Sequence, residues 1–163
     1  MHRYTPKPNR LPAVILSAVC FLAAFSLFVP YSADETFLVF IKGVGTGIFL
    51  IGFVILDRYA FTSFSYSIEA NDSIPGRLDF VVSSVRYGRI RTVCRVSAFD
   101  VTDIVKYDKN RKAEKGVKKY NYCPDLAGEN RYILFLDDDG DAEILFCPDE
   151  KTVNIIKNII NSK

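Results

Sequence analysis

Two long apolar runs dominate the first third of the chain. No charged residue lies between Leu11 and Ala33, and Leu11–Val29 is almost continuously apolar. A second apolar run covers Phe37–Leu56 and is interrupted only by Lys42. Because a helix needs about 20 predominantly apolar residues to cross the hydrocarbon core of a bilayer, each run predicts a transmembrane helix.

Charges around the two runs predict their orientation. The connection PYSADETF is short enough for a tight hairpin, and its charged residues, Asp34 and Glu35, are acidic. Basic residues flank the other ends of the helices: Arg3, Lys7, Arg10 and Arg58. Because positive charge is retained on the cytoplasmic side, we expect a two-pass protein of the cell (inner) membrane with both termini in the cytoplasm. A cleaved signal peptide is the alternative for the first run, but its apolar stretch exceeds the usual length of about 7–15 residues.

Four glycines lie in the second apolar run: Gly43, Gly45, Gly47 and Gly52. Gly43 and Gly47 have the small-xxx-small spacing that lets another helix approach closely. That helix is either the first helix of the same chain or a helix of another molecule, which would make the protein a homo-oligomer or a subunit. Lys42 lies near the outer end of the run, where its stem can extend to the interface.

After Arg58 the apolar positions alternate with a period of two, which is typical of β-strands. The expected strands are Ser65–Ala70, Leu78–Val85, Arg89–Val96, Val101–Tyr107, Tyr120–Cys123, Arg131–Leu136 and Ala142–Phe146. Tyr87–Gly88 is an expected turn. The chain ends in an expected amphipathic helix with Pro148 at its first position, Cys147 at its N-cap and an apolar stripe at Val153, Ile156, Ile159 and Ile160.

These elements predict a membrane α-hairpin joined to one mainly-β domain. Residues 1–10 are expected to be a cytoplasmic N-terminal tail, residues 11–56 the transmembrane hairpin, and residues 57–163 the cytoplasmic domain. The last segment suffices for one modest core. Seven strands and one helix predict a closed or nearly closed small barrel capped by the C-terminal helix.

Two segments of this domain resemble a known family. RYILFLDDDGDAEILFCPDEKTVNIIKNII resembles the last two strands and helix of a pleckstrin-homology-like domain. RIRTVCRVSAFDVTDI is similar to the basic strand that precedes an L/F-x-D-I-type strand in bacterial members. The resemblance covers about residues 60–162. It implies a seven-stranded barrel with a C-terminal helix, placed beside one or two transmembrane helices as is common in bacteria. Members bind lipid headgroups, peptides or proteins, or act as scaffolds, so the fold alone does not select a function.

Residues suited to catalysis or metal binding are few. The one histidine, His2, lies in the expected tail, away from any nucleophile of the domain. The four cysteines (Cys20, Cys94, Cys123 and Cys147) have irregular spacing, and we expect them to be reduced, buried, small apolar side chains. The acidic cluster of residues 137–143 superficially resembles a calcium loop, but Asp139-Gly140 between two apolar runs is the signal of a hairpin turn. We expect no enzymatic activity, no metal and no cofactor.

Basic residues suggest the clearest binding surface. Residues 77–119 carry twelve basic and five acidic side chains (+7), whereas residues 120–150 carry one and nine (−8). The candidate ligand-binding residues are Arg86, Arg89, Arg91, Arg95, Lys115, Lys118 and Lys119. Beside a membrane, each such charge contributes about 1 kcal/mol of attraction to anionic headgroups. A solvated surface and an acidic protein partner are the alternatives. Nucleic acid is not expected, because aromatic and basic residues are not interleaved.

The sequence therefore predicts a non-enzymatic, membrane-anchored binding or scaffold module that recognises anionic lipid or an acidic partner at the inner leaflet. The main alternative is an accessory subunit of a larger membrane complex that associates through its glycine-bearing helix. A sensor whose helices transmit a signal is a third interpretation.

Overall fold

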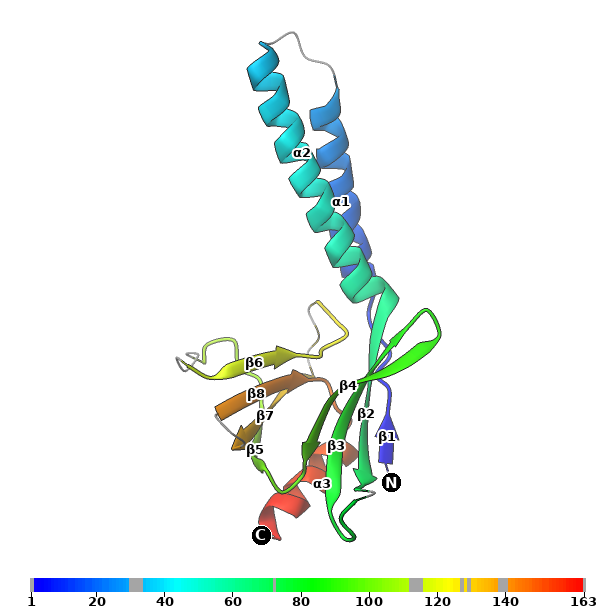
Figure 1. Cartoon of the computed structure of the whole chain (residues 1–163), viewed down its shortest axis with the longest axis vertical. Helices are drawn as coiled ribbons and strands as arrows, with labels where there is room; N and C mark the ends of the chain where they lie inside the picture. The colour runs from blue at the N-terminus through cyan, green and yellow to red at the C-terminus, as the bar shows by residue number, and fades with distance from the viewer. Residues whose placement is uncertain are drawn as a thin grey trace. The chain divides into compact units, whose positions relative to one another are not determined.

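The structure is a computed structural model that describes residues 2–29, 34–71, 73–111, 116–126, 128, 130–137 and 141–162 (Figure 1). The chain divides into two compact units. The helical unit is Asn9–Thr62, and the β unit combines Met1–Pro8 with Ser63–Lys163.

The helical unit is a pair of packed helices. Helix α1 covers Leu11–Phe28, helix α2 covers Glu35–Leu56, and one π-helical turn, η1, follows at Asp57–Phe61. The rings of Phe21 and Phe49 lie 5.1 Å apart between the two helices. Both helices are long and apolar enough to span a membrane, as the sequence predicted. Most of their large apolar side chains are exposed.

Sheet A of the β unit has four strands in the order β1-β2-β3-β4 (Figure 1). They are β1 (His2–Tyr4), β2 (Thr62–Ala70), β3 (Leu78–Arg86) and β4 (Arg89–Ser97). Strand β1 pairs antiparallel with β2, with Tyr4 opposite Tyr66. The N-terminal segment, which the sequence pattern left as a tail, is therefore partly an edge strand of the folded β unit.

Sheet B has the order β5-β7-β8-β6. Its strands are β5 (Val101–Lys106), β6 (Lys118–Asn121), β7 (Tyr132–Asp137) and β8 (Asp141–Phe146). Strands β7 and β8 pair antiparallel with Asp137 opposite Asp141, whereas β6 runs parallel to β8. The expected Asp139-Gly140 turn lies outside the described residues. All seven strands predicted from the sequence are present, displaced by a few residues at their ends.

The core lies between the two sheets and helix α3 (Glu150–Asn161). The ring of Phe146 lies 5.3 Å from that of Tyr66 and 5.1 Å from that of Phe80, so sheets A and B are in direct contact. Helix α3 adds Val153 and Ile156, two residues of the predicted stripe. Burial of these apolar side chains is the main stabilising term of the unit.

The expected closed seven-stranded barrel is wrong. The β unit contains eight strands in two separate four-stranded sheets. The unpredicted strand β1 is the fourth strand of sheet A, and β6 joins sheet B by parallel pairing. A barrel needs one sheet that closes on itself. Here β4 and β6 are edge strands of different sheets.

The predicted N-cap of α3 is also wrong. Asp149, not Cys147, caps the helix, and its carboxylate accepts a hydrogen bond from the Thr152 backbone N–H at 3.0 Å. Aspartate is a stronger cap than cysteine because its oxygen accepts this bond. The His2 ring nitrogen lies 3.2 Å from the same carboxylate, so His2 belongs to the folded unit and not to a remote tail. Burial raises the pKa of Asp149, but the hydrogen bonds from Thr152 and His2 outweigh it and lower the pKa.

Candidate functional site

A tight β-hairpin joins β3 to β4. Its two turn residues, Tyr87 and Gly88, have φ values of 49° and 74°. Two consecutive positive φ angles match the twist of a two-residue hairpin, and glycine adopts the second without strain. The turn predicted at Tyr87–Gly88 is confirmed.

Three arginines share one face of this hairpin. In the antiparallel register Arg86 lies opposite Arg89, and Ser84 lies opposite Arg91. Side chains two residues apart project from the same side of a strand, so the three guanidinium groups gather on one side. All three residues are exposed, and with Ser84, Tyr87 and Val93 they line a surface hollow of about 430 Å³. We call Arg86, Arg89 and Arg91 the arginine face.

The arginine face has no described acidic partner at Arg89 or Arg91. The Arg86 guanidinium lies over the Tyr87 ring, 5.3 Å from its centroid. Tyr87 is 71% exposed at the tip, and Ile90 is 58% exposed on the opposite side of the hairpin. The hairpin therefore combines cationic donors with exposed apolar side chains, the two groups that a membrane interface accommodates.

Arg95 does not belong to this face. Val82 lies opposite Cys94 but Ser83 lies opposite Thr92, so Val93 is an extra residue in β4. Such a bulge reverses the alternation of side chains along the strand. Arg89 and Arg91 consequently share a side with Cys94, and Arg95 projects from the other side of sheet A.

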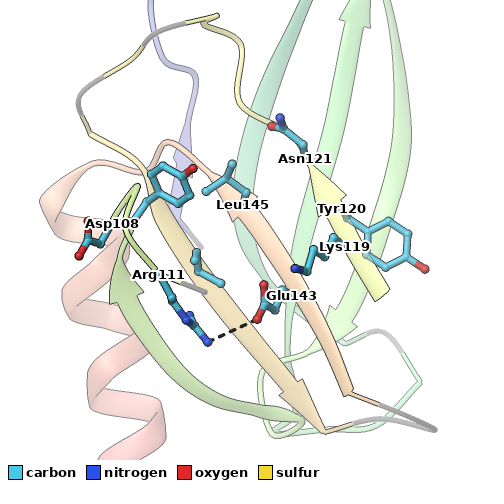
Figure 2. A pocket seen from close by; sticks show the side chains of 9 residues that line it. Asp108, Arg111, Lys119, Tyr120, Asn121, Glu143 and Leu145 are labelled. Atoms are coloured by element: carbon cyan, nitrogen blue, oxygen red, sulfur yellow. Dashed lines mark hydrogen bonds and ion pairs between the residues drawn. The ribbon is translucent and has the colours of Figure 1, made fainter. Parts of the chain in front are cut away.

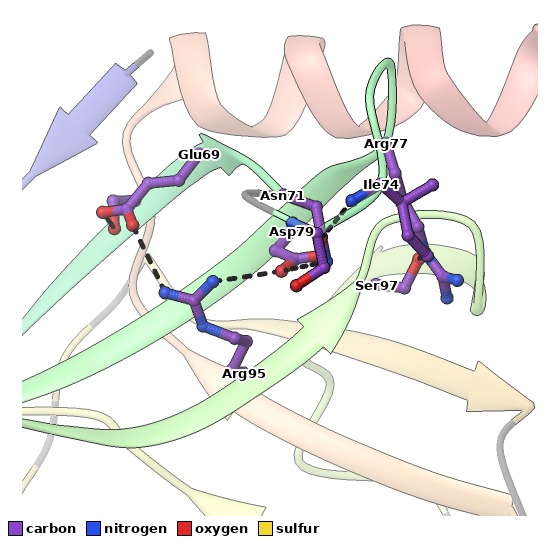
Figure 3. A network of polar contacts seen from close by, with 9 residues as sticks. Glu69, Asn71, Ile74, Arg77, Asp79, Arg95 and Ser97 are labelled. Atoms are coloured by element: carbon purple, nitrogen blue, oxygen red, sulfur yellow. Dashed lines mark hydrogen bonds and ion pairs between the residues drawn. The ribbon is translucent and has the colours of Figure 1, made fainter.

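Arg95 instead belongs to a polar network on the outer side of sheet A (Figure 3). Its Nη1 lies 3.2 Å from Asp79 Oδ2, and its Nη2 lies 3.7 Å from Glu69 Oε2. Asn71 Nδ2 donates to the same Asp79 carboxylate at 3.0 Å. Asp79 is only 3% exposed. Because a buried carboxylate must be paired, Arg95 stabilises the fold by neutralising Asp79.

The lysines of the basic segment lie on sheet B, beside acidic residues. Lys118 and Lys119 are exposed on β6, and Lys119 lies opposite Glu143 of β8. Arg111 pairs with Glu143 at 3.4 Å and lies over the ring of Phe135, 4.4 Å from its centroid. Part of the +7 segment is thus neutralised by the −8 segment. Lys115 lies outside the described residues.

This part of sheet B contains a hollow of about 250 Å³ (Figure 2). Ile133 and Leu145 give it an apolar floor, and Tyr107 and the Arg111–Glu143 pair border it. Its charged lining residues are balanced, with Arg111 and Lys119 against Asp108 and Glu143. The hollow therefore has no excess positive charge with which to attract anions, unlike the arginine face.

The four glycines of α2 fall into two pairs. A Cβ on Gly45 would lie 3.3 Å from Leu27 Cβ, and one on Gly52 would lie 2.9 Å from Cys20 Cβ, so this pair allows α1 to approach closely. A Cβ on Gly43 or Gly47 would have no described atom within 4 Å. The pair with small-xxx-small spacing is therefore not the pair that packs on α1.

No protein-family model matches the chain, and no curated protein or solved structure matches it either. The pleckstrin-homology-like resemblance therefore stays a prediction. Arg86, Arg89 and Arg91 lie together, as the sequence pattern predicted. The pattern did not indicate Tyr87 and Ile90 as their exposed companions, or Arg111 as the partner of Glu143. Hairpin period and turn position could have indicated Ile90, whereas Arg111 had no sequence signal because its partner is distant in the chain.

Proposed function

We propose that this chain is a non-enzymatic, membrane-anchored binding module whose arginine face contacts the anionic phosphate groups of the bilayer that its own helices span. Its location is the cell membrane, with the β unit on the cytoplasmic side. Arginine suits this task because its planar guanidinium binds phosphate oxygens in a bidentate manner.

The observation that carries the proposal is the position in sheet A of the two chain connections to the apolar helices, one after β1 and one before β2. Ser63, the first β-unit residue after the helices, donates from its Oγ to Val85 O at 3.4 Å. At the far end of the same two strands, Asn71 N donates to Arg77 O at 2.8 Å. Strand β2 therefore begins beside the β3–β4 hairpin, which bears the arginine face.

The N-terminal connection leaves the same end of sheet A. Thr5 Oγ1 donates to Ser65 Oγ at 3.1 Å, so β1 runs toward the beginning of β2 before the chain reaches α1. Both connections to the apolar helices thus start at the end that carries the arginine face. The negative potential of anionic headgroups extends about a Debye length, near 8 Å at physiological salt. Two short connections at this end of sheet A favour the approach of the arginine face to within that distance.

The membership of the β unit supports an even number of crossings. Residues 1–8 and the C-terminal helix belong to the same folded unit, which supports a placement of both chain ends on one side of the membrane. The basic residues Arg3, Lys7, Arg10 and Arg58 support the cytoplasmic side for that unit.

The charges of the arginine face set the strength of its attraction to an anionic membrane surface. Three arginines near an anionic surface contribute about 3 kcal/mol together, which corresponds to about a hundredfold in surface association. Tyr87 at the tip adds an amphipathic ring of the type enriched at membrane interfaces.

A single tryptophan tests this proposal, because the chain contains none. Full-length protein carrying Tyr87→Trp is placed in nanodiscs with neutral or anionic lipid, and quenching by brominated lipid is measured. We expect stronger quenching in anionic discs and its loss when Arg86, Arg89 and Arg91 are all changed to Gln.

Phe99→Trp is the matched control for this measurement. Phe99 is 53% exposed and follows β4 at the opposite end of sheet A, so it should not be quenched in either lipid. Equal quenching of the Tyr87 reporter in neutral and anionic discs would refute lipid recognition by the arginine face.

A second function, as an accessory subunit or homo-oligomer, is favoured by the open pair Gly43 and Gly47. Nothing described within the chain occupies the space beside them, so a helix of another molecule can approach there. Replacing both by Ile should abolish helix association in a membrane two-hybrid reporter without disturbing packing on α1. An unchanged signal would exclude this face as the contact.

A further inference from the structure

Cys123 and Cys147 occur in the same short sequence, Cys-Pro-Asp. Each triplet follows a strand of sheet B, because β6 ends at Asn121 and β8 ends at Phe146. The two strands are parallel with Asn121 opposite Leu145, so two more residues in the same register bring Cys123 opposite Cys147. Tyr122 N donates to Leu145 O at 2.8 Å and holds this register beyond the end of β6.

The two thiols are in direct contact. Their Sγ atoms lie 3.0 Å apart, and Cys123 and Cys147 are 1% and 7% exposed. Both cysteines are free thiols. A disulfide has its sulfurs about 2.05 Å apart, so the two sulfurs need to approach by about 1 Å.

The surroundings make the two thiols unequal. The hydrogen bond between them lowers the pKa of Cys147, with a further contribution from the Arg131 guanidinium, and raises the pKa of Cys123. Cys147 is also the more exposed of the two. Because the thiolate is the nucleophile of thiol–disulfide exchange, Cys147 is suited to react first and Cys123 to resolve the product.

We propose that Cys123 and Cys147 form a redox pair that closes into an intramolecular disulfide and fastens β6 to the segment before α3. The oxidant is a small-molecule disulfide such as oxidised glutathione. The Cys147 thiolate attacks one of its sulfurs, forms a mixed disulfide and expels one thiol. Cys123, deprotonated, then attacks the Cys147 sulfur and expels the second thiol. The protein loses two protons and two electrons, and the oxidant is reduced to two thiols.

A disulfide between Cys123 and Cys147 would hold strand β6 in sheet B. Four residue pairs join it to β8, its own residues are all exposed, and it is an edge of sheet B. A covalent link two residues past its end removes the fraying to which such an edge is subject. The reduced protein is therefore expected to release β6 more often than the oxidised protein.

The test uses the full chain in detergent micelles, equilibrated with mixtures of reduced and oxidised glutathione. Mass spectrometry should find a loss of two hydrogen atoms and a cross-linked peptide that joins Cys123 to Cys147. A variant with Cys20→Ser and Cys94→Ser should behave identically, because it retains the pair. Cys123→Ala should instead hold a persistent glutathione adduct at Cys147.

Hydrogen exchange measures the consequence for β6. We expect the amides of Lys118–Asn121 to exchange several-fold more slowly in the oxidised protein. Two results would overturn the proposal: a pair that stays reduced while Cys20 or Cys94 reacts, or a cross-link that leaves the exchange of β6 unchanged.

Discussion

Arg91 and Arg95 lie on the same strand, yet the structure predicts that the same substitution affects a different property at each position: membrane contact at Arg91 and stability at Arg95. Replacing either by Gln removes one positive charge from β4. Arg91 belongs to the arginine face and has no described acidic partner, whereas Arg95 pairs with the buried Asp79 at 3.2 Å. We therefore expect Arg95→Gln to lower stability and Arg91→Gln to lower membrane contact.

The magnitudes follow from burial. Leaving a buried charged acceptor without one of its partners costs about 1–3 kcal/mol. The Arg95 side chain is 46% exposed, so water replaces part of the lost bond, and Asn71 still donates to Asp79. We expect about 1–2 kcal/mol, which lowers Tm by about 5–15 °C for a domain of this size. Arg91→Gln should change the free energy of unfolding by less than about 0.5 kcal/mol.

Membrane contact gives the complementary measurement. Loss of one charge near an anionic surface costs about 1 kcal/mol, or about a fivefold weaker association, and should be seen for Arg91→Gln with the Tyr87→Trp reporter. Thermal unfolding is followed in the same nanodiscs by near-ultraviolet circular dichroism. An unchanged Tm for Arg95→Gln, or an equal loss of Tm for Arg91→Gln, would refute these different roles of the two arginines.

Three further predictions concern other parts of the chain. Gly52→Ala should destabilise the helix pair in micelles by about 1–3 kcal/mol, because its Cβ would lie 2.9 Å from Cys20 Cβ, whereas Gly43→Ala should not; equal effects would contradict the packing. The pKa of Asp149 is lowered in the folded protein, so the free energy of unfolding should fall as the pH drops below 3.8, the usual pKa of this carboxyl group. Asp149→Asn still caps α3 but does not titrate, so it should flatten a plot of Tm against pH. Parallel curves for the two proteins would be contrary evidence. In intact cells, a membrane-impermeant thiol reagent should label a cysteine at position 32, which lies outside the described residues, but not one at Ser162; labelling at Ser162 would overturn the cytoplasmic placement.

Local patterns in the sequence predicted most of the secondary structure. The apolar runs predicted both helices of the helical unit, and period-two alternation predicted seven strands. Both signals depend on neighbours within a few residues, which is why they survive without tertiary information. Strand β1 had no such signal: three residues, His2–Tyr4, acquire their conformation only by pairing with β2.

The candidate site was predicted in part, for the same reason. Arg86, Arg89 and Arg91 meet because a two-residue turn and simple alternation place them together, and both can be inferred from the sequence. Arg95 has the spacing of the same face, but the extra residue at Val93 turns it to the other side. Whether a strand contains a bulge depends on its partner strand, so the sequence of β4 alone cannot reveal it.

The sequence by itself determined both apolar helices, seven of the eight strands, the hairpin turn and the clustering of three arginines, because these follow from local geometry. Tertiary structure alone decided which basic side chains are paired with acidic residues inside the protein and which remain available to bind a ligand. Arg95 and Arg111 pair with Asp79 and Glu143, partners that lie 16 and 32 residues away in the chain. It also decided that the thiols of Cys123 and Cys147 touch, because the parallel register of β6 and β8 is a choice between distant segments. Such pairings depend on how the whole core packs, and no local pattern records them.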